Sequence, residues 1–149
     1  MQDAEIRKGI DRFDRWHYEF DLRGYKTPIV GGRNHANRHA QRRRYYFDPL
    51  VQHLGGTLRG KRVLDLGCNA GFWSLLALEA GADYVLGIDA RPMHIEQAAF
   101  VFEAKEVDRH RYDFTCKNVF GLSPSELGTF DIVFCLDRGG TCKPVPTQS

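Results

Sequence analysis

The sequence predicts an α/β domain built on a parallel sheet of about four strands. An apolar strand at residues 62–66 is followed by a glycine loop at residues 67–71 and then by an apolar helix. A second strand, residues 84–89, ends in an acidic residue, and strand and helix patterns continue to alternate up to residue 136. Such alternation is typical of parallel sheets, because each strand needs a crossover helix before the next one.

The part of the chain before the sheet, residues 1–56, is expected to form an extension of helices and a hairpin. Apolar residues recur at helical spacing over residues 4–20, which predicts an amphipathic helix that packs on the core. Residues 19–22 and 25–27 flank an Arg-Gly pair, which predicts a short hairpin. A Gly-Gly loop follows the hairpin, and a second Gly-Gly pair separates the extension from the sheet.

The core is assigned to residues 57–136, and its later elements follow from apolar periodicity and from helix-breaking residues. After the first strand we expect, in order, a helix at 72–80, a strand at 84–89, a helix at 93–107, a strand at 112–117 and a strand at 130–136. The remaining residues, 137–149, contain two prolines and show neither helical nor strand periodicity, so they are expected to form an irregular tail.

Length and composition indicate one globular domain. The chain has 149 residues, of which 42% are hydrophobic and 27% are charged, as in ordinary globular proteins. No apolar run approaches the ~20 residues that span a bilayer, and the N-terminus lacks a signal-peptide pattern, so a cytoplasmic location without a membrane partner is expected. The four cysteines include no C-x-x-C pair, which argues against a zinc ribbon or a redox motif.

Basic residues are concentrated in the first part of the chain. Residues 1–60 carry 12 Lys/Arg and 7 Asp/Glu, whereas residues 61–149 carry 9 and 12. The basic and aromatic run at residues 34–46 either contacts RNA or forms a solvated helix face, and we favour the helix face because one basic run is not an RNA-binding fold. His35 and His39 have the spacing of zinc ligands on a helix, but without a third ligand nearby no metal site is predicted.

The loop after the first strand has the pattern Asp-x-Gly-x-x-x-Gly, from Asp65 to Gly71. It lacks the second glycine of a dinucleotide fingerprint and the Lys-Ser/Thr ending of a phosphate loop. Its glycines allow the backbone to approach a small ligand, and the helix that follows presents unpaired N–H groups at its start. Asp89, at the end of the second strand, adds a second acidic side chain.

Together these motifs resemble the class I S-adenosylmethionine (SAM)-dependent methyltransferases over residues 46–136. The resemblance implies a Rossmann-like sheet and SAM as the cofactor. Within that superfamily the chain is similar to the group that contains the bacterial tRNA wobble-uridine carboxymethyltransferases, on residues 16–22, 24–28 and 46–50 and on the second strand. Both SAM and a carboxylated SAM therefore stay open as cofactors.

The resemblance also implies roles for individual residues. Asp89 is expected to accept hydrogen bonds from the ribose hydroxyls, the alternative being that it caps the following helix. Asp65 either orients the loop and meets the methionine ammonium through water or satisfies loop N–H groups. Asn118 and the Val119 N–H are expected near the adenine. The full set of expected cofactor-binding residues is Asp65, Gly67, Cys68, Asn69, Gly71, Asp89, Ala90, Asn118, Val119 and Leu136.

The activity that the resemblance implies is methyl transfer from SAM to an acceptor, either a small molecule or RNA. No residue stands out as a catalytic base. A complete family member would continue after the fourth strand with further strands, so a truncated chain is expected, with residues 132–134 at an open edge that invites self-association or a partner. The alternative function is a catalytically inactive fragment that binds SAM or a partner.

Overall fold

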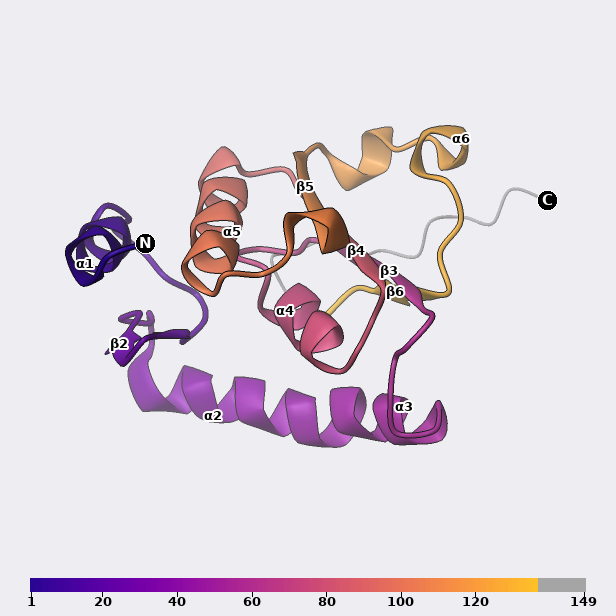
Figure 1. Cartoon of the computed structure of the whole chain (residues 1–149), viewed down its shortest axis with the longest axis horizontal. Helices are drawn as coiled ribbons and strands as arrows, with labels where there is room; N and C mark the ends of the chain where they lie inside the picture. The colour runs from indigo at the N-terminus through magenta and orange to yellow at the C-terminus, as the bar shows by residue number, and fades with distance from the viewer. Residues whose placement is uncertain (137–149) are drawn as a thin grey trace.

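The computed structural model describes residues 1–136, and its centre is a four-stranded parallel sheet with the strand order β5-β4-β3-β6 (Figure 1). Strands β3, β4 and β5 step in one direction, and β6 returns to the other side of β3. All four carboxyl ends therefore lie at one edge of the sheet, and the strand order reverses beside β3, which is where such sheets bind ligands. The strands are β3 (Arg62–Leu66), β4 (Tyr84–Asp89), β5 (Tyr112–Cys116) and β6 (Ile132–Phe134).

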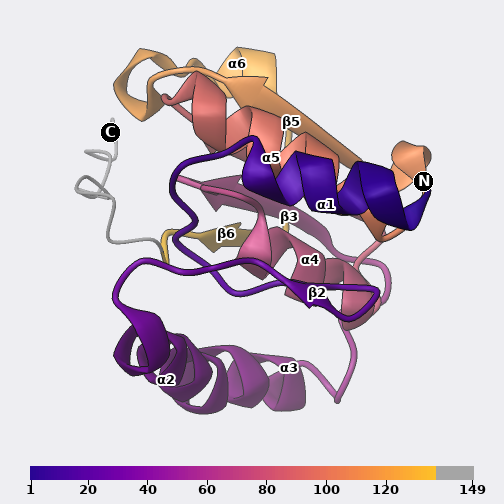
Figure 2. The same ribbon diagram turned by 90° about the vertical axis from the view of Figure 1, so that its left-hand side faces the viewer.

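Two helices follow the first two strands of this sheet, α4 (Phe72–Glu79) after β3 and α5 (Pro92–Ala104) after β4. Right-handed crossovers in the same direction place both helices on one face of the sheet. Helix α4 buries six successive residues, from Trp73 to Leu78, so it has no solvent-exposed stripe there. It is covered because the sheet packs on one side of it and the N-terminal extension on the other (Figure 2).

The N-terminal extension contains three α-helices and a hairpin, and a π-helical turn joins the second helix to the third. Helix α1 packs along α5, where Gly9 lies so close to the Phe100 ring that a Cβ would overlap it (Figure 2). Helices α2 and α3 run along the opposite side of α4. The elements are α1 (Asp3–Asp11), β1 (Asp21–Leu22), β2 (Tyr25–Lys26), α2 (Gly32–Arg42), the π-helix η1 (Arg43–Phe47) and α3 (Asp48–His53).

The amphipathic helix expected over residues 4–20 ends at Asp11, so that prediction is wrong for its second half. Trp16, which fitted the helical spacing, instead forms a parallel bridge with Ile29, and its indole N–H donates to the Ile10 carbonyl at 3.1 Å. Both Trp16 and Tyr18 are fully buried. Burial in an extended segment thus produced an apolar spacing that resembles a helix.

The hairpin and the core elements agree with the sequence prediction, with differences at their ends. Arg23 and Gly24 have φ of 55° and 88°, as a two-residue hairpin turn requires. The helix expected at 93–107 ends at Ala104, and the strand expected at 130–136 is limited to three residues. The connection before that strand contains a short helix, α6 (Pro124–Leu127), and two 3-10 turns, η2 (Arg109–Arg111) and η3 (Val119–Gly121), lie on either side of β5.

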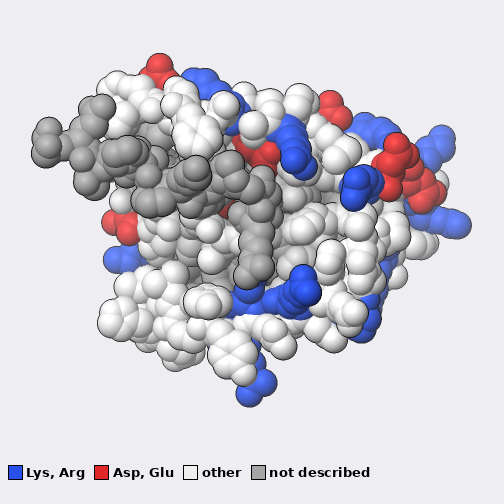
Figure 3. Space-filling model, turned by 180° about the vertical axis from the view of Figure 1, so that it is seen from behind, with Lys and Arg blue, Asp and Glu red and all other residues white. Residues whose placement is uncertain are grey.

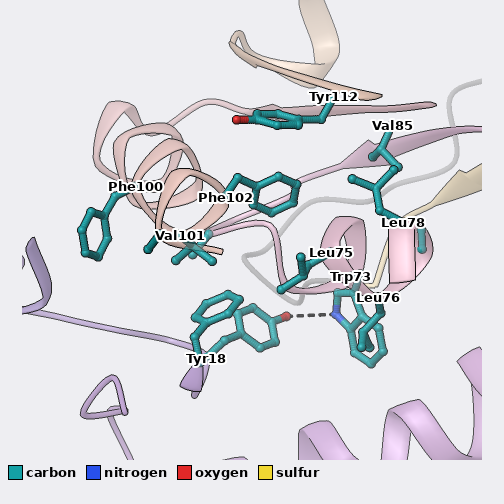
Figure 4. Packing of buried hydrophobic residues seen from close by; sticks show 14 of the residues in the cluster. Tyr18, Trp73, Leu75, Leu76, Leu78, Val85, Phe100, Val101, Phe102 and Tyr112 are labelled. Atoms are coloured by element: carbon teal, nitrogen blue, oxygen red, sulfur yellow. Dashed lines mark hydrogen bonds between the residues drawn. The ribbon is translucent and has the colours of Figure 1, made fainter. Parts of the chain in front are cut away.

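One cluster of buried side chains joins the extension to the sheet (Figure 4). The Trp73 indole N–H in α4 donates to the Tyr18 hydroxyl at 3.2 Å, which ties the extension to the helix after the glycine loop. On the other side of α5, the Phe102 ring meets the Tyr112 ring edge-on, with centroids 4.7 Å apart. The extension is therefore part of the packed core, and its position relative to the sheet edge is fixed.

Strand β6 lies at the end of the sheet, as expected, and within residues 1–136 it pairs with β3 alone. Phe134 is buried, whereas Val133, the middle residue of β6, is 56% exposed. None of the helices in the described part of the chain is both long and apolar enough to cross a membrane.

Candidate cofactor site

The glycine loop follows β3 and is tied to the end of β4 by its backbone. The N–H groups of Gly67 and Cys68 both donate to the Ile88 carbonyl, at 2.8 and 2.9 Å. Gly67, Asn69 and Gly71 have φ of 70°, 53° and 82°, which is the left-handed region that favours glycine. The loop therefore turns sharply at the carboxyl edge of the sheet and leads directly into α4.

Asp89 links this loop to the start of α5. Its Oδ2 accepts the Asn69 N–H at 2.9 Å, and its Oδ1 accepts the Arg91 N–H at 2.9 Å. The His94 ring Nδ1 lies 3.1 Å from the same Oδ1. Burial raises the pKa of Asp89, but hydrogen bonds from His94, Arg91 and Asn69 outweigh it, and the net pKa lies below its usual value.

The carboxylate of Asp89 therefore stays ionised and keeps its orientation at the sheet edge. It accepts the N–H of Arg91, the residue that precedes α5, and so holds the turn between β4 and the helix, but no side chain caps the backbone of α5, so the capping alternative is not what the structure shows. The contact with Arg91 is compatible with a second role toward a ligand, because each carboxylate oxygen accepts more than one hydrogen bond.

Asp65, at the penultimate position of β3, is fully buried. Its Oδ2 accepts the hydroxyl of Ser74, in the first turn of α4, at 2.7 Å. The side chain thus joins the strand to the helix across the glycine loop. This contact fits the expectation that Asp65 orients the loop.

The two glycines of the motif face different surroundings. A Cβ at Gly67 would meet nothing within 4 Å, so this position faces open space. A Cβ at Gly71 would lie 3.0 Å from the Phe102 ring and 3.1 Å from the Phe114 ring. Gly67 thus leaves room for a ligand against the backbone, whereas Gly71 is required by the packing of α5 and β5.

The other expected residues lie at the same edge of the sheet, because each follows a parallel strand. Ala90 is exposed directly after β4, and Cys68 is buried beneath the loop. The Asn118 side chain, after β5, accepts the Phe120 N–H at 3.0 Å and so caps the turn that begins with Val119. The Leu136 carbonyl, after β6, accepts a hydrogen bond from Arg42 of α2 at 2.7 Å.

These residues fit an adenosine-containing cofactor. The space over Gly67 lies beside the ionised carboxylate of Asp89, close to the point where the strand order reverses. Asn118 and Val119 follow β5, which lies two strands away from β3. Three neighbours were not anticipated from the sequence, namely His94, Ser74 and Arg42. His94 and Ser74 each lie a short distance along the chain from their partner acid, whereas Arg42 is 94 residues from Leu136 and gives no sequence signal.

The histidine pair on α2 is not arranged as a metal site. Within residues 1–136, no group of three or more His, Cys, Asp or Glu side chains is placed to hold a metal ion. His39 is buried against Tyr18, with ring centroids 4.2 Å apart, and His35 lies one turn before it.

Comparison with known proteins gives consistent relatives. Residues 63–144 match the family described as "Methyltransferase domain". The chain is 36% identical over 80 residues to the ubiquinone biosynthesis O-methyltransferase of Neisseria meningitidis serogroup C, a match that covers 54% of this chain and 33% of that protein. It is 37% identical over 82 residues to the tRNA U34 carboxymethyltransferase of Pseudomonas putida, covering 53% of this chain and 24% of that protein.

Solved structures extend the likeness to nearly the whole chain. The N-terminal domain of EvdMO1 with SAH bound has 25% sequence identity and a TM-score of 0.69, covering 91% of this chain and 54% of that one. The magnesium protoporphyrin IX methyltransferase of Synechocystis, also with bound SAH, has 27% identity and a TM-score of 0.52, covering 66% and 42%.

The chain spans about a third or less of the length of these curated relatives. The matched family covers more than half of the chain, and the Rossmann-like sheet and the SAM-dependent relatives agree with it. Both solved structures hold bound SAH, the molecule that remains when SAM has lost its methyl group. The chain belongs to the class I SAM-dependent methyltransferases.

Proposed function

We propose that the chain binds SAM at the carboxyl edge of its sheet and transfers the methyl group to an acceptor. The observation that carries this proposal is the ionised Asp89 carboxylate beside the open space over Gly67, at the reversal of the strand order. In the proposed complex, Asp89 accepts hydrogen bonds from the ribose hydroxyls of SAM. The loop backbone from Gly67 to Asn69 lies against the ligand, and Asn118 with the Val119 N–H lies near the adenine.

The bound cofactor supplies a methyl group that is already activated by a positively charged sulfur. The task of the protein is then to hold donor and acceptor in line and to exclude water, which can supply most of the rate. Asp65 and Ser74 hold the strand and helix on either side of the loop in register for this purpose. An acceptor with a proton on its reacting atom also needs that proton removed.

Calorimetric titration with SAM tests the proposal on the 149-residue chain. Asp89→Asn keeps the shape of the side chain but removes its charge, and we expect it to weaken SAM binding at least tenfold, in keeping with about 1.5–3 kcal/mol for a hydrogen bond to a charged group. Asp14→Asn is the matched control, because it removes the same charge from an exposed position before the hairpin. Equal affinity of Asp89→Asn and the unaltered chain would overturn the proposed site.

A second candidate is binding of SAM without methyl transfer, with a partner chain on β6. It is supported by the position of β6 at the end of the sheet and by the exposure of Val133. Light scattering of the chain and of Val133→Lys tests this candidate, because a lysine on an edge strand discourages strand pairing. A monomer at all concentrations, together with methyl transfer by the monomer, would exclude it.

A further inference from the structure

A pocket of about 680 Å³ lies between α2 and the buried segment that follows α1. Its volume is in the range of sites for small organic molecules. Basic and aromatic side chains line it, and none of the described residues that line it is acidic. The residues that matter for its chemistry are His17, Arg38, His39, Arg42, Tyr45 and Tyr46.

The arginines between residues 33 and 43 divide into two groups, those that form an ion pair and those that line the pocket. Arg33 pairs with Glu19 at 3.2 Å, and Arg43 pairs with Asp48 at 3.7 Å. Arg38 and Arg42, which line the pocket, form no ion pair within residues 1–136. They lie one helical turn apart, so both side chains stand on one face of α2, and the Arg42 guanidinium keeps N–H groups beyond the one that donates to Leu136.

Figure 3, which views the molecule from behind, shows Lys and Arg side chains in the lower middle of this face, where α2 and η1 run, without Asp or Glu beside them. Asp and Glu side chains lie elsewhere on the same face, so the positive charge is local to this part of it. Such a surface attracts an anion and orients it.

The pocket adjoins the cofactor edge of the sheet. Arg42 donates to the Leu136 carbonyl at the end of β6, at 2.7 Å. From the pocket wall a row of rings leads to the glycine loop: His39 contacts Tyr18 with centroids 4.2 Å apart, and Tyr18 stacks on Phe72 at 4.8 Å and 8°. Phe72 is the first residue of α4, directly after Gly71. These packed rings lie between the pocket and the glycine loop, and the contact of Arg42 with Leu136 is what places the pocket next to the sheet edge.

The pocket also contains polar and planar groups suited to a small ring. The Tyr45 and Tyr46 side chains are 64% and 66% exposed. Exposed aromatic rings of this size favour contact with a ligand. The pocket is half open to solvent, and its volume favours a small molecule.

We propose that this pocket holds the methyl acceptor and that the acceptor is a small aromatic molecule with a carboxylate or phosphate group. Arg38 and Arg42 bind the anionic group, as paired guanidinium groups bind carboxylate and phosphate. The aromatic ring lies among the histidine and tyrosine rings, with its reacting atom directed to the sheet edge. This assignment rests on the proposed function, because it takes the carboxyl edge of the sheet as the place of SAM.

The experiment compares probes that differ in one group, each titrated into the chain with SAH present. The probes are 4-hydroxybenzoate, phenyl phosphate and phenol, which share a ring but differ in charge. We expect at least one of the two anions to bind at least tenfold more tightly than phenol, and the stronger of the two identifies the anionic group. Arg38→Gln is expected to weaken its binding about tenfold and to leave SAH binding unchanged.

Arg33→Gln is the matched control, because it removes the same charge from the same helix at a position outside the pocket. Equal effects of Arg38→Gln and Arg33→Gln, or equal affinities of phenol and both anions, would overturn the inference. So would binding of a short single-stranded RNA in an Arg38-dependent manner with no binding of the anions. SAH binding is measured on the same samples. Failure of the unaltered chain to bind SAH would count against the proposed function and not against the pocket.

Discussion

The imidazole Nδ1 of His94 lies 3.1 Å from Oδ1 of Asp89, and both side chains are only 9% exposed. An ionised carboxylate accepts hydrogen bonds and cannot donate them, so Nδ1 carries the proton in this contact. His94 stands in the first turn of α5 and holds the carboxylate from the side opposite the glycine loop. It is a positioning residue for Asp89.

Replacing His94 by leucine tests that role. His94→Leu removes one of the hydrogen bonds that lower the pKa of Asp89, so the carboxylate loses both stabilisation and orientation. We expect SAM affinity to fall about 3- to 10-fold, which corresponds to about 1 kcal/mol for one hydrogen bond. Calorimetry with Asp89→Asn and the double variant measures the coupling, and full additivity of the two changes would contradict the assigned role.

Changing Gly67 and Gly71 to alanine should affect different properties of the protein, SAM affinity in one case and stability in the other. Both have positive φ, so each substitution costs about 1 kcal/mol or more in backbone strain. Gly71→Ala also forces its methyl group against Phe102 and Phe114, so we expect the larger loss of stability in urea unfolding. Gly67→Ala meets open space, so we expect a mainly affinity-related effect on SAM. The opposite ranking in either measurement would show that the glycine roles are reversed.

The buried His39 should make stability depend on pH. Burial, together with the charges of His17, Arg42 and His35, lowers the pKa of His39 from 6.5 to about 4. The unfolded chain then binds a proton that the folded chain does not, so the contribution is present above pH 6.5 and is lost as the pH falls toward 4.

Between pH 7 and pH 5 this group accounts for up to about 2 kcal/mol of lost stability. The free energy of unfolding of the unaltered chain and of His39→Gln, measured across that range, isolates it. We expect the variant to show a shallower pH dependence. Parallel curves would mean that His39 does not titrate in this window.

The hydrogen bond from Ser74 to Asp65 should matter for folding. Both residues are fully buried, and Ser74→Ala withdraws a hydroxyl at 2.7 Å from a buried carboxylate. We expect a loss of about 1–3 kcal/mol in the free energy of unfolding, because a buried carboxylate is left with fewer partners. Ser125→Ala, at an exposed position in α6, is the control. A loss no larger than that of the control would contradict this account.

Local sequence patterns were enough to predict the parallel sheet, the glycine loop between β3 and α4, and the placement of Asp89 after β4. These features depend on local patterns: an apolar strand of five or six residues, glycines at left-handed positions, and an acid directly after a strand. Because parallel strands share an orientation, the residues that follow them gather at one edge whatever the details of packing. The superfamily was predicted from the resemblance of these motifs to a known family.

The path of the chain before the sheet depends on tertiary contacts and could not be predicted from local patterns. Trp16 and Tyr18 are buried in an extended segment instead of a helix because the bridge to Ile29 and the contact with Trp73 outweigh local helical preference. Likewise, Arg33 pairs with Glu19, which lies outside the helix, whereas Arg38 and Arg42 form no ion pair within residues 1–136, and helical spacing alone does not separate them. The pocket beside the sheet edge therefore could not be found from spacing, because contacts between segments, and not the local sequence, create it.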